Sequence, residues 1–356
     1  MVRKVTLQDL ADRLGVARST VSRALRGDPQ IGVDTRARVQ RLAGELDYHP
    51  NAAARALTRR RAGVVGLVLP RTSRFVFSNP YFSELLEGIS SVAEPAELPI
   101  LVSAAVRPDY VGWLRAGRVD GLIVLGSSLE GEELRLLETL AAKGSPVVSI
   151  HAPSAPTSLV TVTSDEGPGL LGACEHLALL GHEHVAVVTG PPTSHYARAR
   201  AAGWKGASAR VGMTTLRTVH GDDTFASGAA AARTLLAERT AATAWLLGND
   251  LMAFGALQAL ADAGVRVPGD VAVVGFDDVM PAAVVGLSTV HQGVRTLGEE
   301  AMRALHALLR SATPQPIPLV TRFVPRRTSA PSGLAPPTAA RAAEGGPFET
   351  PVTRTR

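Results

Sequence analysis

Residues 6–25 read TLQDLADRLGVARSTVSRAL, and this stretch predicts two short helices joined by a tight turn. Small or apolar side chains recur at helical spacing in both halves, namely Leu7, Leu10, Ala11 and Leu14 in the first and Ala17, Thr20, Val21 and Ala24 in the second. Gly15 and Val16 supply the turn. Thr6 can cap the first helix, with Asp9 in its first turn. The pattern is therefore that of a helix-turn-helix.

The second of these helices keeps a polar and basic outer face. Its members are Arg18, Ser19, Ser22, Arg23 and Arg26. In a helix-turn-helix the second helix lies in the major groove of DNA, where an arginine can bind guanine through two hydrogen bonds and serines reach phosphates or bases. The alternative is a small helical pair with a solvated basic face. We expect DNA binding.

The length of the chain and the distribution of its charge predict a second module beside the helix-turn-helix. The chain has 356 residues, which predicts about two or three domains. The net charge is +5, but residues 1–61 hold thirteen basic and six acidic side chains, so +7 lies there and −2 in the remainder. Such local basicity suits one nucleic-acid-binding module on a near-neutral body. A hydrophobic share of 46% with only 4% aromatic residues predicts a core of Ala, Val and Leu.

Cysteine usage and hydropathy predict a cytoplasmic protein without a membrane partner. Cys174 is the single cysteine, so no disulfide forms within the chain, and we expect it to be buried on a helix. No apolar run approaches the roughly 18 residues of a membrane span. Arg3 and Lys4 lead directly into the first helix, which leaves no room for a signal peptide.

Two further segments complete the N-terminal part. A third helix is predicted from about 33 to 46, with its apolar stripe formed by Ala37, Val39, Leu42 and Leu46. Pro50 ends this region, and residues 52–61 read AAARALTRRR with Leu57 as the only large apolar side chain. A helix of this kind is marginal alone and needs a partner. We therefore divide this part into a headpiece, 1–50, and a conditional helix, 51–61.

From Gly63 onward, short aliphatic runs alternate with helical stretches, which predicts parallel sheets covered by helices on both faces. The predicted strands are Val64–Leu69, Ile100–Ser103, Gly121–Leu125, Pro146–Ile150, Val160–Thr163, Val185–Thr189, Leu216–Val219, Ala244–Leu247 and Val271–Phe276. The predicted helices are Phe82–Ala93, Gly169–Leu180, Ser227–Glu238 and Met252–Ala263.

The body is too long for one sheet and predicts two α/β lobes within residues 62–330. Crossovers are expected near Val160, Leu287 and Pro318, which assigns 62–160 and 291–318 to the first lobe and 161–290 and 319–330 to the second. A ligand is expected between the lobes, at the carboxyl ends of the strands. Residues 331–356 are rich in Pro, Ala and Gly, and predict a disordered tail.

Further motifs follow the headpiece in a fixed order. They are LDYHPNAAARAL at 46–57, EHLALLGHEHVAVVTGP at 175–191, ARARAAGW at 197–204, LLGND at 246–250, VAVVGFDD at 271–278 and LSTVHQ at 287–292. With the helix-turn-helix, they resemble the lac repressor and galactose repressor family of bacterial transcription regulators over roughly residues 4–330. The resemblance implies an all-α headpiece on a body like the periplasmic binding proteins, homodimerisation, and control by a ligand.

The resemblance also implies a set of DNA-binding residues: Thr6, Arg18, Ser19, Thr20, Ser22, Arg23, Asn51, Ala54 and Leu57. In the family, the residues matching Arg18, Ser19 and Arg23 read the half-site. The linker forms a hinge helix only on operator DNA, begins at the position of Asn51, and wedges a leucine, here Leu57, into a central base step.

For the effector, the resemblance implies a second set: Tyr81, Phe82, His151, Arg200, Asp223, Asn249 and Asp277. Arg200 and Asp277 together suit vicinal hydroxyls, so a sugar or polyol is the natural ligand, although a purine or phosphorylated sugar could also use Arg200. Phe82 is equally explained as a core residue at a helix start. Relatives often carry an aromatic residue at the position of Asp223 and an acid at that of His151, so a particular sugar specificity does not transfer.

Other chemistry is weakly indicated. His176, His182 and His184 cluster, but no cysteine or acid completes a zinc ligand set at the usual spacing. Asp277 and Asp278 follow a strand, but no Walker loop, dinucleotide fingerprint or nucleophile elbow accompanies them. We expect no metal, cofactor or enzymatic activity. A soluble sugar-binding protein of the same two-lobed fold is the alternative to the favoured function, a ligand-responsive dimeric repressor on a palindromic operator.

Overall fold

The computed structural model describes residues 5–48, 61–106, 109–126, 131–151, 158–315 and 318–329. The predicted hinge residues Asn51, Ala54 and Leu57 and the predicted tail, 331–356, lie outside these ranges. The structure divides into two compact units, one with the headpiece and residues 113–120 and one with the rest of the body. The headpiece and the body are described one after the other.

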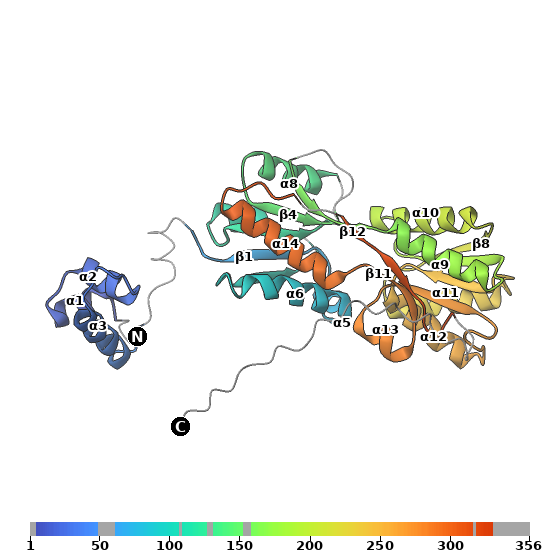
Figure 1. The fold of residues 1–356 in the computed structure, drawn as a ribbon, viewed down its shortest axis with the longest axis horizontal. Coiled ribbons are helices and arrows are strands. Elements are labelled where there is room, and N and C mark those ends of the chain that lie inside the picture. The colour runs from blue at the N-terminus through green and yellow to red at the C-terminus, as the bar shows by residue number, and fades with distance from the viewer. Residues whose placement is uncertain are drawn as a thin grey trace, which may run out of the picture. The chain divides into compact units, whose positions relative to one another are not determined.

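The headpiece consists of three helices, α1 (Leu7–Leu14), α2 (Arg18–Leu25) and α3 (Val33–Glu45) (Figure 1). The predicted cap is present: the Asp9 amide donates to Thr6 Oγ1 over 3.3 Å, and the Asp9 carboxylate accepts from the Thr6 amide over 2.8 Å. Gly15 ends α1 with φ 65°, a left-handed conformation that glycine adopts without strain. The α1–α2 unit is thus the predicted helix-turn-helix.

Side chains from all three helices form the headpiece core, namely Leu10, Ala11, Val21, Ala24, Val39 and Ala43. Two predicted core positions are wrong. Ala17 is exposed because it occupies the position just before α2 and is not part of the helix. Ala37 is exposed because it lies two residues, about 200° of helical turn, from the buried Val39, and Ala43 takes the inward position instead.

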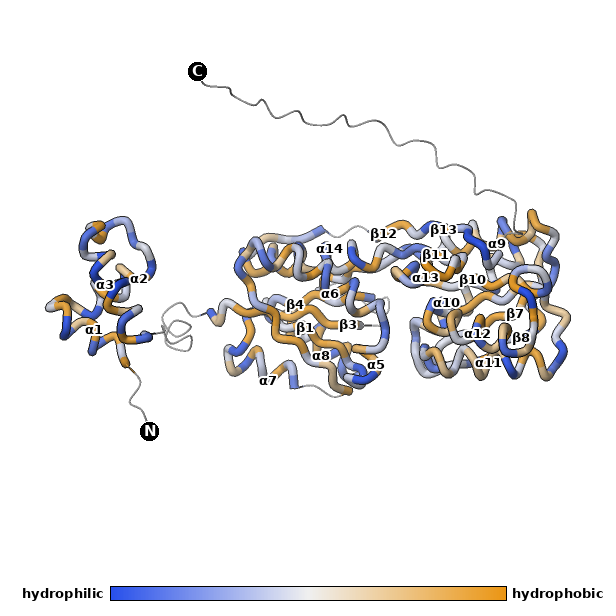
Figure 2. Tube along the Cα trace, turned by 90° about the horizontal axis from the view of Figure 1, so that it is seen from below, coloured by the Kyte–Doolittle hydropathy of each residue, from blue (hydrophilic) through white to orange (hydrophobic). Residues whose placement is uncertain are grey.

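The first sheet of the body has five parallel strands in the order β2 (Ile100–Ala104), β1 (Val65–Leu69), β3 (Gly121–Leu125), β4 (Val147–Ile150) and β5 (Val160–Val162). Helices in this part are α5 (Ser73–Ser78), α6 (Pro80–Ala93), α7 (Tyr110–Arg115), α8 (Glu132–Ala142) and α14 (Val294–Leu309). The core joins the strands to α6 and α14 through side chains such as Leu67, Ile89 and Leu297. Figure 2 shows β1, β3 and β4 as apolar along their length, as expected of strands buried on both faces.

Two glycines let α6 and α14 approach closely. A Cβ at Gly88 would lie 1.9 Å from the carbonyl oxygen of Arg295, and one at Gly298 would lie 2.3 Å from that of Leu85. Since these neighbours are backbone atoms, no side-chain rotation could make room. The contact fixes α14, which returns late in the chain, against the first sheet.

The second sheet has six strands in the order β13 (Arg322–Val324), β11 (Ser288–His291), β10 (Ala272–Asp277), β9 (Ala244–Leu247), β7 (His184–Thr189) and β8 (Thr214–His220). All pairs are parallel except β13 with β11, so this sheet is mixed rather than purely parallel as expected. Its other elements are α9 (Gly167–Leu179), α10 (His195–Arg210), α11 (Phe225–Ala237), α12 (Asp250–Asp262) and α13 (Met280–Val285).

Helices cover both faces of the second sheet, as predicted. On one face, Val187 of β7 packs with Leu170 of α9 and Trp204 of α10. On the other face, Val188 packs with side chains of α11 and α12 that include Leu235. The alternation along β7 follows from the two-residue period of a strand.

The chain crosses between the two sheets three times. It leaves the first sheet after β5, and β6 (Ser164–Asp165) in this crossing pairs with β12 (Leu319–Val320) of the last crossing. It leaves the second sheet after β11 and enters α14. Strands β5 and β11 thus extend to Val162 and His291, so the predicted divisions at 160 and 290 fall inside them. Each of the nine predicted strands is present, with its ends shifted by at most two residues.

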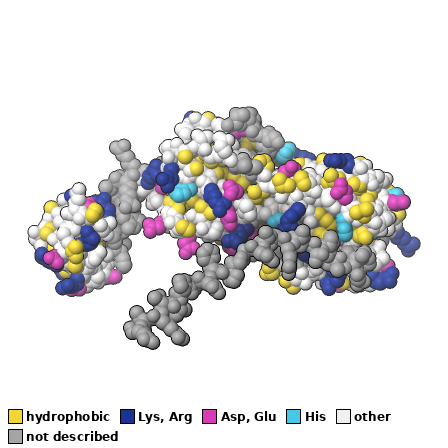
Figure 3. Space-filling model, viewed as in Figure 1, with side chains coloured by type: hydrophobic (Ala, Val, Ile, Leu, Met, Phe, Trp, Pro, Cys, Tyr) yellow, Lys and Arg dark blue, Asp and Glu magenta, His cyan; other side chains and the backbone are white. Residues whose placement is uncertain are grey.

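The body surface is mixed in charge. On the face shown in Figure 3, acidic and basic side chains are interspersed over the body, which fits its near-neutral sequence charge. Among the described residues, no helix is long and apolar enough to cross a membrane.

Candidate functional site

Helix α2 presents part of the predicted DNA-binding set. Arg18 and Ser19 are exposed at its first positions, while Thr20 and Ser22 are half-buried beside the core residue Val21. The free amides and positive dipole end at the start of a helix favour nearby phosphates. Arg18 and Ser19 are thus exposed beside the free amides at the start of α2.

Two members of the set are engaged within the headpiece. Arg23 donates through Nε to the Asp28 carboxylate over 2.8 Å, and its Nη2 hydrogen-bonds to Gln30. The Arg23 pair lowers the pKa of Asp28. Thr6 is exposed, and its side chain and amide form the cap of α1 with Asp9. Arg23 must exchange these contacts if it is to reach a base.

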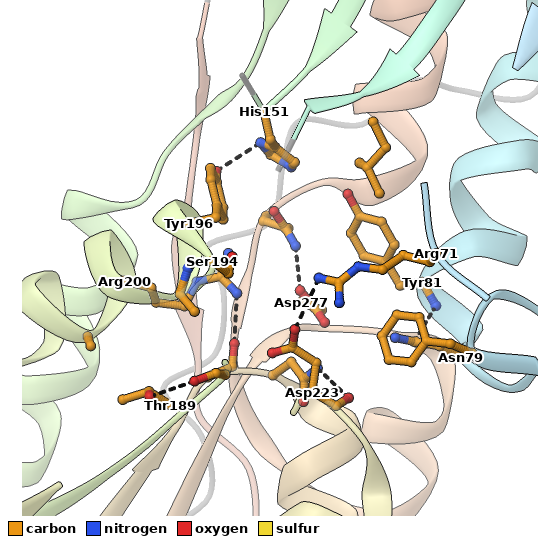
Figure 4. Close-up of a pocket in the computed structure, with 18 of the residues that line it drawn as sticks. Arg71, Asn79, Tyr81, His151, Thr189, Ser194, Tyr196, Arg200, Asp223 and Asp277 are labelled. Atoms are coloured by element: carbon orange, nitrogen blue, oxygen red, sulfur yellow. Dashed lines mark hydrogen bonds and ion pairs between the residues drawn. The ribbon is translucent and has the colours of Figure 1, made fainter. Parts of the chain in front are cut away.

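The seven predicted effector residues line one pocket of the body, at the carboxyl ends of strands of both sheets (Figure 4). They are Tyr81 and Phe82 on α6, His151 after β4, Arg200 on α10, Asp223 after β8, Asn249 before α12 and Asp277 at the end of β10. Parallel topology brings them together, since the carboxyl ends of strands and the loops that follow share one edge of each sheet. Side chains separated by up to about two hundred positions thus face one cavity.

Arg200 is held on several sides. Its Nε and Nη2 donate to the Glu166 carboxylate, the shortest contact being 2.6 Å, and its Nη1 donates to the Gly248 carbonyl over 2.7 Å. The guanidinium carbon lies 3.6 Å from the centre of the Phe276 ring. Only 12% of the Arg200 and 15% of the Glu166 side chain is exposed. The result is a largely buried, two-pronged ion pair.

His151 is joined to α10 across the pocket. Its Nδ1 lies 2.8 Å from the Tyr196 hydroxyl, and the two ring centres are 4.7 Å apart. Burial, with a smaller contribution from the positive charge of Arg200, lowers the pKa of His151 to about 3, so the ring is neutral near pH 7. His151 follows the first sheet and Tyr196 belongs to the second lobe, so this contact connects the lobes.

Asp277 is almost completely buried, with 6% exposure, and has a φ of 119°. Its Oδ1 accepts a hydrogen bond from the side-chain amide of Gln292, whose carbonyl oxygen accepts from Ser164 over 3.4 Å. Burial raises the pKa of Asp277, and the charge of Arg200 opposes that effect. The two crossovers that carry Ser164 and Gln292 thus position this carboxyl group.

Asp223 and Arg71 form a second contact across the pocket. Arg71 Nη2 lies 3.4 Å from Asp223 Oδ2, and the Arg71 guanidinium stacks over Phe75 with 5.1 Å to the ring centre. Burial raises the pKa of Asp223, whereas the charge of Arg71 lowers it. Arg71 follows β1 of the first sheet and Asp223 follows β8 of the second.

Known proteins match both parts of the chain. The model for bacterial regulatory proteins of the lacI family matches residues 6–51, and that for the periplasmic binding protein-like domain matches 174–329. The transcriptional regulator CelR of Thermobifida fusca is 32% identical over 330 residues, which cover 89% of this chain and 96% of CelR. The chain belongs to the lacI family of bacterial regulatory proteins.

Other members of the family agree. The lactose operon repressor of Escherichia coli K12 is 30% identical over 312 residues, covering 85% of this chain and 84% of the repressor. A lac repressor dimer bound to operator and the anti-inducer ONPF superposes with a TM-score of 0.82 at 29% identity, covering 92% of this chain and 99% of that one. This lacI-family protein is a DNA-binding, ligand-responsive transcriptional regulator and not an enzyme.

Some predicted pocket residues of this regulator also stabilise the fold around the pocket. Asn249 caps α12, because its Oδ1 accepts from the Met252 amide over 2.8 Å and its Nδ2 donates to the Asp223 carbonyl over 3.0 Å. Phe82 both lines the pocket and belongs to the first core, where its ring packs edge-on against Tyr81 at 5.3 Å. Phe82 is therefore a core residue at the start of α6, and its contact with an effector stays a prediction.

Sequence reasoning missed several polar residues at this site, among them Arg71, Glu166, Tyr196 and Gln292. Tyr196 and Gln292 lie beside or within motifs quoted above, since Tyr196 directly precedes ARARAAGW and Gln292 ends LSTVHQ. Arg71 and Glu166 stand in segments without a periodic pattern, and nothing in the sequence pairs Glu166 with Arg200.

Two histidines of the predicted cluster hydrogen-bond to nearby hydroxyl groups. His176 Nε2 lies 3.1 Å from Ser329 Oγ, and His182 Nδ1 lies 2.8 Å from Thr243 Oγ1. Among the residues that the structure describes, no three His, Cys, Asp or Glu side chains are grouped so that they could hold a metal ion. Cys174 is fully buried on α9, as predicted, with its Sγ 3.6 Å from Ser208 Oγ.

Proposed function

We propose that this regulator binds a palindromic operator as a homodimer and responds to a neutral, hydroxylated effector, a sugar or polyol, in the pocket of the body. In this proposal residues 1–50 recognise DNA, 51–61 form the hinge, and 62–330 bind the effector and dimerise. The expected direction is repression that the effector modulates.

The observation that carries the effector class is the ion pair of Arg200 with Glu166. A free arginine in a pocket favours a phosphate or carboxylate, but the two prongs of this guanidinium already hold a carboxylate. The other arginine of the lining, Arg71, faces Asp223. Both guanidinium groups that line the described pocket are thus balanced by an acid, which disfavours a phosphorylated sugar and favours a neutral ligand.

The remaining groups suit hydroxyls. Asp277, Asp223 and His151 offer polar atoms around the cavity, and the rings of Tyr81 and Phe82 offer an apolar wall. Sugar sites combine these elements, since ring faces pack on aromatic groups while hydroxyls pair with polar side chains. The related CelR has been solved as a cellobiose complex with a TM-score of 0.67 at 30% identity, covering 91% of this chain and 100% of that one.

On the DNA side, we propose Arg18 and Ser19 as base-reading residues, with Thr6, Thr20 and Ser22 toward the phosphates. Arg23 joins the readers once a base or phosphate replaces Asp28 as its partner. The exposure of Arg18 and Ser19 at the start of α2 supports this assignment. Asn51, Ala54 and Leu57 remain predictions for the hinge.

The test uses the full-length protein and a DNA site that it selects from a random-sequence pool. Thermal shift is measured with matched pairs: glucose, galactose and ribose, each against its terminal phosphate. Every compound that stabilises the protein is then titrated against labelled operator by fluorescence anisotropy. We expect a neutral member to raise Tm and change operator affinity at least about tenfold, with its phosphate inactive.

The same titration on two variants locates the site. Asp277→Ala is expected to keep operator binding but lose the response. Asp270→Ala is the matched control, because Asp270 pairs with Arg266 on the exposed surface, and it should respond as the native protein does. Preference for the phosphorylated sugars, or a normal response in Asp277→Ala, contradicts the proposal.

A further inference from the structure

The chain enters the body through a short segment that one residue, Asp120, holds in place. Asp120 Oδ1 accepts a hydrogen bond from the Ala62 amide over 2.6 Å, and Oδ2 accepts one from the Gly63 amide over 2.7 Å. The backbone of Asp120 takes part as well, because its amide donates to the Val64 carbonyl over 2.8 Å. Three hydrogen bonds thus hold three successive residues at one position, and we call this arrangement the entry clamp.

The local sequence explains how one carboxylate serves two successive amides. Gly63 has a φ of 69°, a left-handed conformation that glycine adopts without strain. In turns of this kind, neighbouring N–H groups can point into one concavity, which favours an anionic acceptor. A carboxylate offers two acceptor oxygens and no donor, so it satisfies both amides at once. A side-chain amide of the same size could accept only one of these bonds.

The entry clamp lies at the amino ends of two neighbouring strands of the first sheet (Figure 2). The chain enters β1 directly after the clamp, and Asp120 directly precedes β3; the two strands pair in parallel from Val65 with Gly121 onward. Their carboxyl ends reach the effector pocket, because Leu125 ends β3, Arg71 follows β1, and both residues line the pocket. Five strand residues span about 17 Å. The strand pair therefore connects the clamp at one end with the pocket at the other.

The clamp restricts the backbone where the predicted hinge, 51–61, joins the body. Fixing the backbone of one residue corresponds to roughly a five- to thirtyfold change in an equilibrium constant. Residues released from the clamp would have to be ordered again each time the hinge folds on DNA. They would also move independently of β1 and β3, so a displacement of the first lobe would reach the hinge in weakened form.

We propose that Asp120 is a positioning residue that fixes the direction in which the hinge leaves the body, and that it thereby couples the effector pocket to operator binding. The inference rests on the proposed function for the hinge and for the ligand. A purely structural Asp120 would affect the stability of the body and leave operator affinity and the response to an effector unchanged. The experiments separate these two roles.

The first experiment needs neither effector nor DNA. Amide hydrogen exchange of the full-length protein is followed by mass spectrometry with fragmentation that resolves single residues. Gly63 is exposed, so slow exchange of its amide reports the hydrogen bond rather than burial. We expect exchange at Gly63 to be at least about tenfold slower than in an unstructured chain, and Asp120→Asn to remove that protection.

The matched control is Asp109→Asn. Asp109 is also exposed or nearly so in a loop of the first lobe, and its carboxylate accepts from a glycine amide, that of Gly112, over 2.9 Å. This variant makes the same chemical change without touching the clamp, and exchange at Gly63 should stay as slow as in the native protein. Thermal unfolding establishes that each variant is folded before its exchange is interpreted.

The second experiment measures the coupling itself. Operator affinity is determined by fluorescence anisotropy, without sugar and with a saturating amount of glucose, galactose or ribose, whichever raises Tm most. In Asp120→Asn we expect operator affinity to fall at least about fivefold, and the ratio of affinities with and without sugar to move toward one. The sugar should bind as it does to the native protein in calorimetric titration, because the clamp and the pocket lie at opposite ends of the strands. Asp109→Asn should match the native protein in all three measurements.

Gly63→Ala perturbs the clamp from the other side and leaves the carboxylate in place. The new Cβ meets no atom within 4 Å, so the packing of the body is preserved, but a φ of 69° is strained for alanine and the amide must turn away. It should reproduce both effects of Asp120→Asn on operator binding. Should Asp120→Asn fail to fold, this variant supplies the same test.

Two results overturn the proposal. One is free exchange of the Gly63 amide in the native protein. The other is a folded Asp120→Asn or Gly63→Ala variant with native operator affinity and a native response to the sugar. If no sugar of the panel raises Tm, the proposed ligand class fails, whereas amide exchange and operator affinity without sugar still decide the role of Asp120.

Discussion

The buried ion pair between Arg200 and Glu166 predicts a large effect of a very small change. Glu166→Gln preserves size and one hydrogen-bond acceptor but removes the charge, which leaves the Arg200 cation without its counterion. Removing one partner of a fully buried pair costs about 3–5 kcal/mol. Here the side chains keep 12% and 15% exposure, and Arg200 retains the Gly248 carbonyl and the Phe276 ring. We therefore expect about 3 kcal/mol, the lower end.

The chain offers a matched control for this substitution. Arg217 and Glu238 form an ion pair with the same two-pronged geometry, at 2.9 and 2.8 Å, but 48% and 39% of their side chains are exposed. Exposed pairs contribute about 0–1 kcal/mol, because water already solvates both ions. Glu238→Gln makes the same chemical change and differs only in burial.

The assay is urea unfolding of the full-length protein, followed by the fluorescence of its three tryptophans, Trp113, Trp204 and Trp245. Trp204 and Trp245 are fully buried in the second lobe, so their part of the signal reports unfolding of the region that holds both ion pairs. The free energy of unfolding should fall by about 3 kcal/mol in Glu166→Gln and change far less in Glu238→Gln, whose ion pair is already solvated. Equal losses in the two variants would refute the argument from burial.

Sulfate supplies an independent readout. In Glu166→Gln the freed Arg200 can bind an anion, so sulfate should raise its Tm more than it raises that of the native protein or of Glu238→Gln. An equal response in all three proteins means that Glu166 does not neutralise Arg200. The reason given for a neutral effector would then be lost.

Three further predictions concern other parts of the molecule. Gly88→Ala places a Cβ 1.9 Å from the carbonyl oxygen of Arg295, so thermal unfolding should show that the free energy of unfolding falls by about 3 kcal/mol. The control is Gly206→Ala, at a helical position with open space around it. This substitution should raise the free energy of unfolding by at most about 1 kcal/mol. Arg18→Ala should weaken operator binding by about 1–3 kcal/mol and relax the preference at one base pair, as read by repeated site selection. Burial raises the pKa of Asp250 to about 7 from 3.8, so its stabilising contribution is complete below pH 4 and is lost as the pH rises through 7. The midpoint of urea unfolding should therefore fall over this pH range, and it should fall less in Asp250→Asn. The same pH dependence in both proteins would contradict the raised pKa of Asp250.

The fold could be predicted wherever its cause is local. A helix-turn-helix can be predicted from twenty residues, because the helical period, the glycine turn and the cap all lie within the same short segment. Buried parallel strands can be predicted from their aliphatic runs. The ends of the predicted strands between Val65 and Asp277 lie within two residues of the observed ends. The mixed second sheet was missed because β13 is three residues long and joins β11 from the far end of the body. Such a strand has too few residues to show a period.

The pocket could be predicted only in part, and the reason is also physical. The family resemblance indicates which positions face the ligand, and all seven line the pocket. It does not indicate which atoms remain available there. Arg200 is largely occupied by Glu166, which stands in a crossover 34 positions away, and Asn249 is occupied by the cap of α12. Whether a polar residue is free depends on its tertiary partners, which the sequence does not pair.

The contacts around the pocket fall into two groups, those that a movement of the lobes would change and those that it would leave intact. The Arg200–Glu166 pair lies wholly in the second lobe, so it survives any rigid displacement and sets the charge of the pocket in every state. Arg71 with Asp223 at 3.4 Å and His151 with Tyr196 at 2.8 Å connect the lobes and must change when the lobes move. A ligand can shift an equilibrium only by its differential affinity for the two states. An effector bound by Asp223 and His151 touches the groups that distinguish the states, whereas one bound by Arg200 alone would bind both states equally and shift neither.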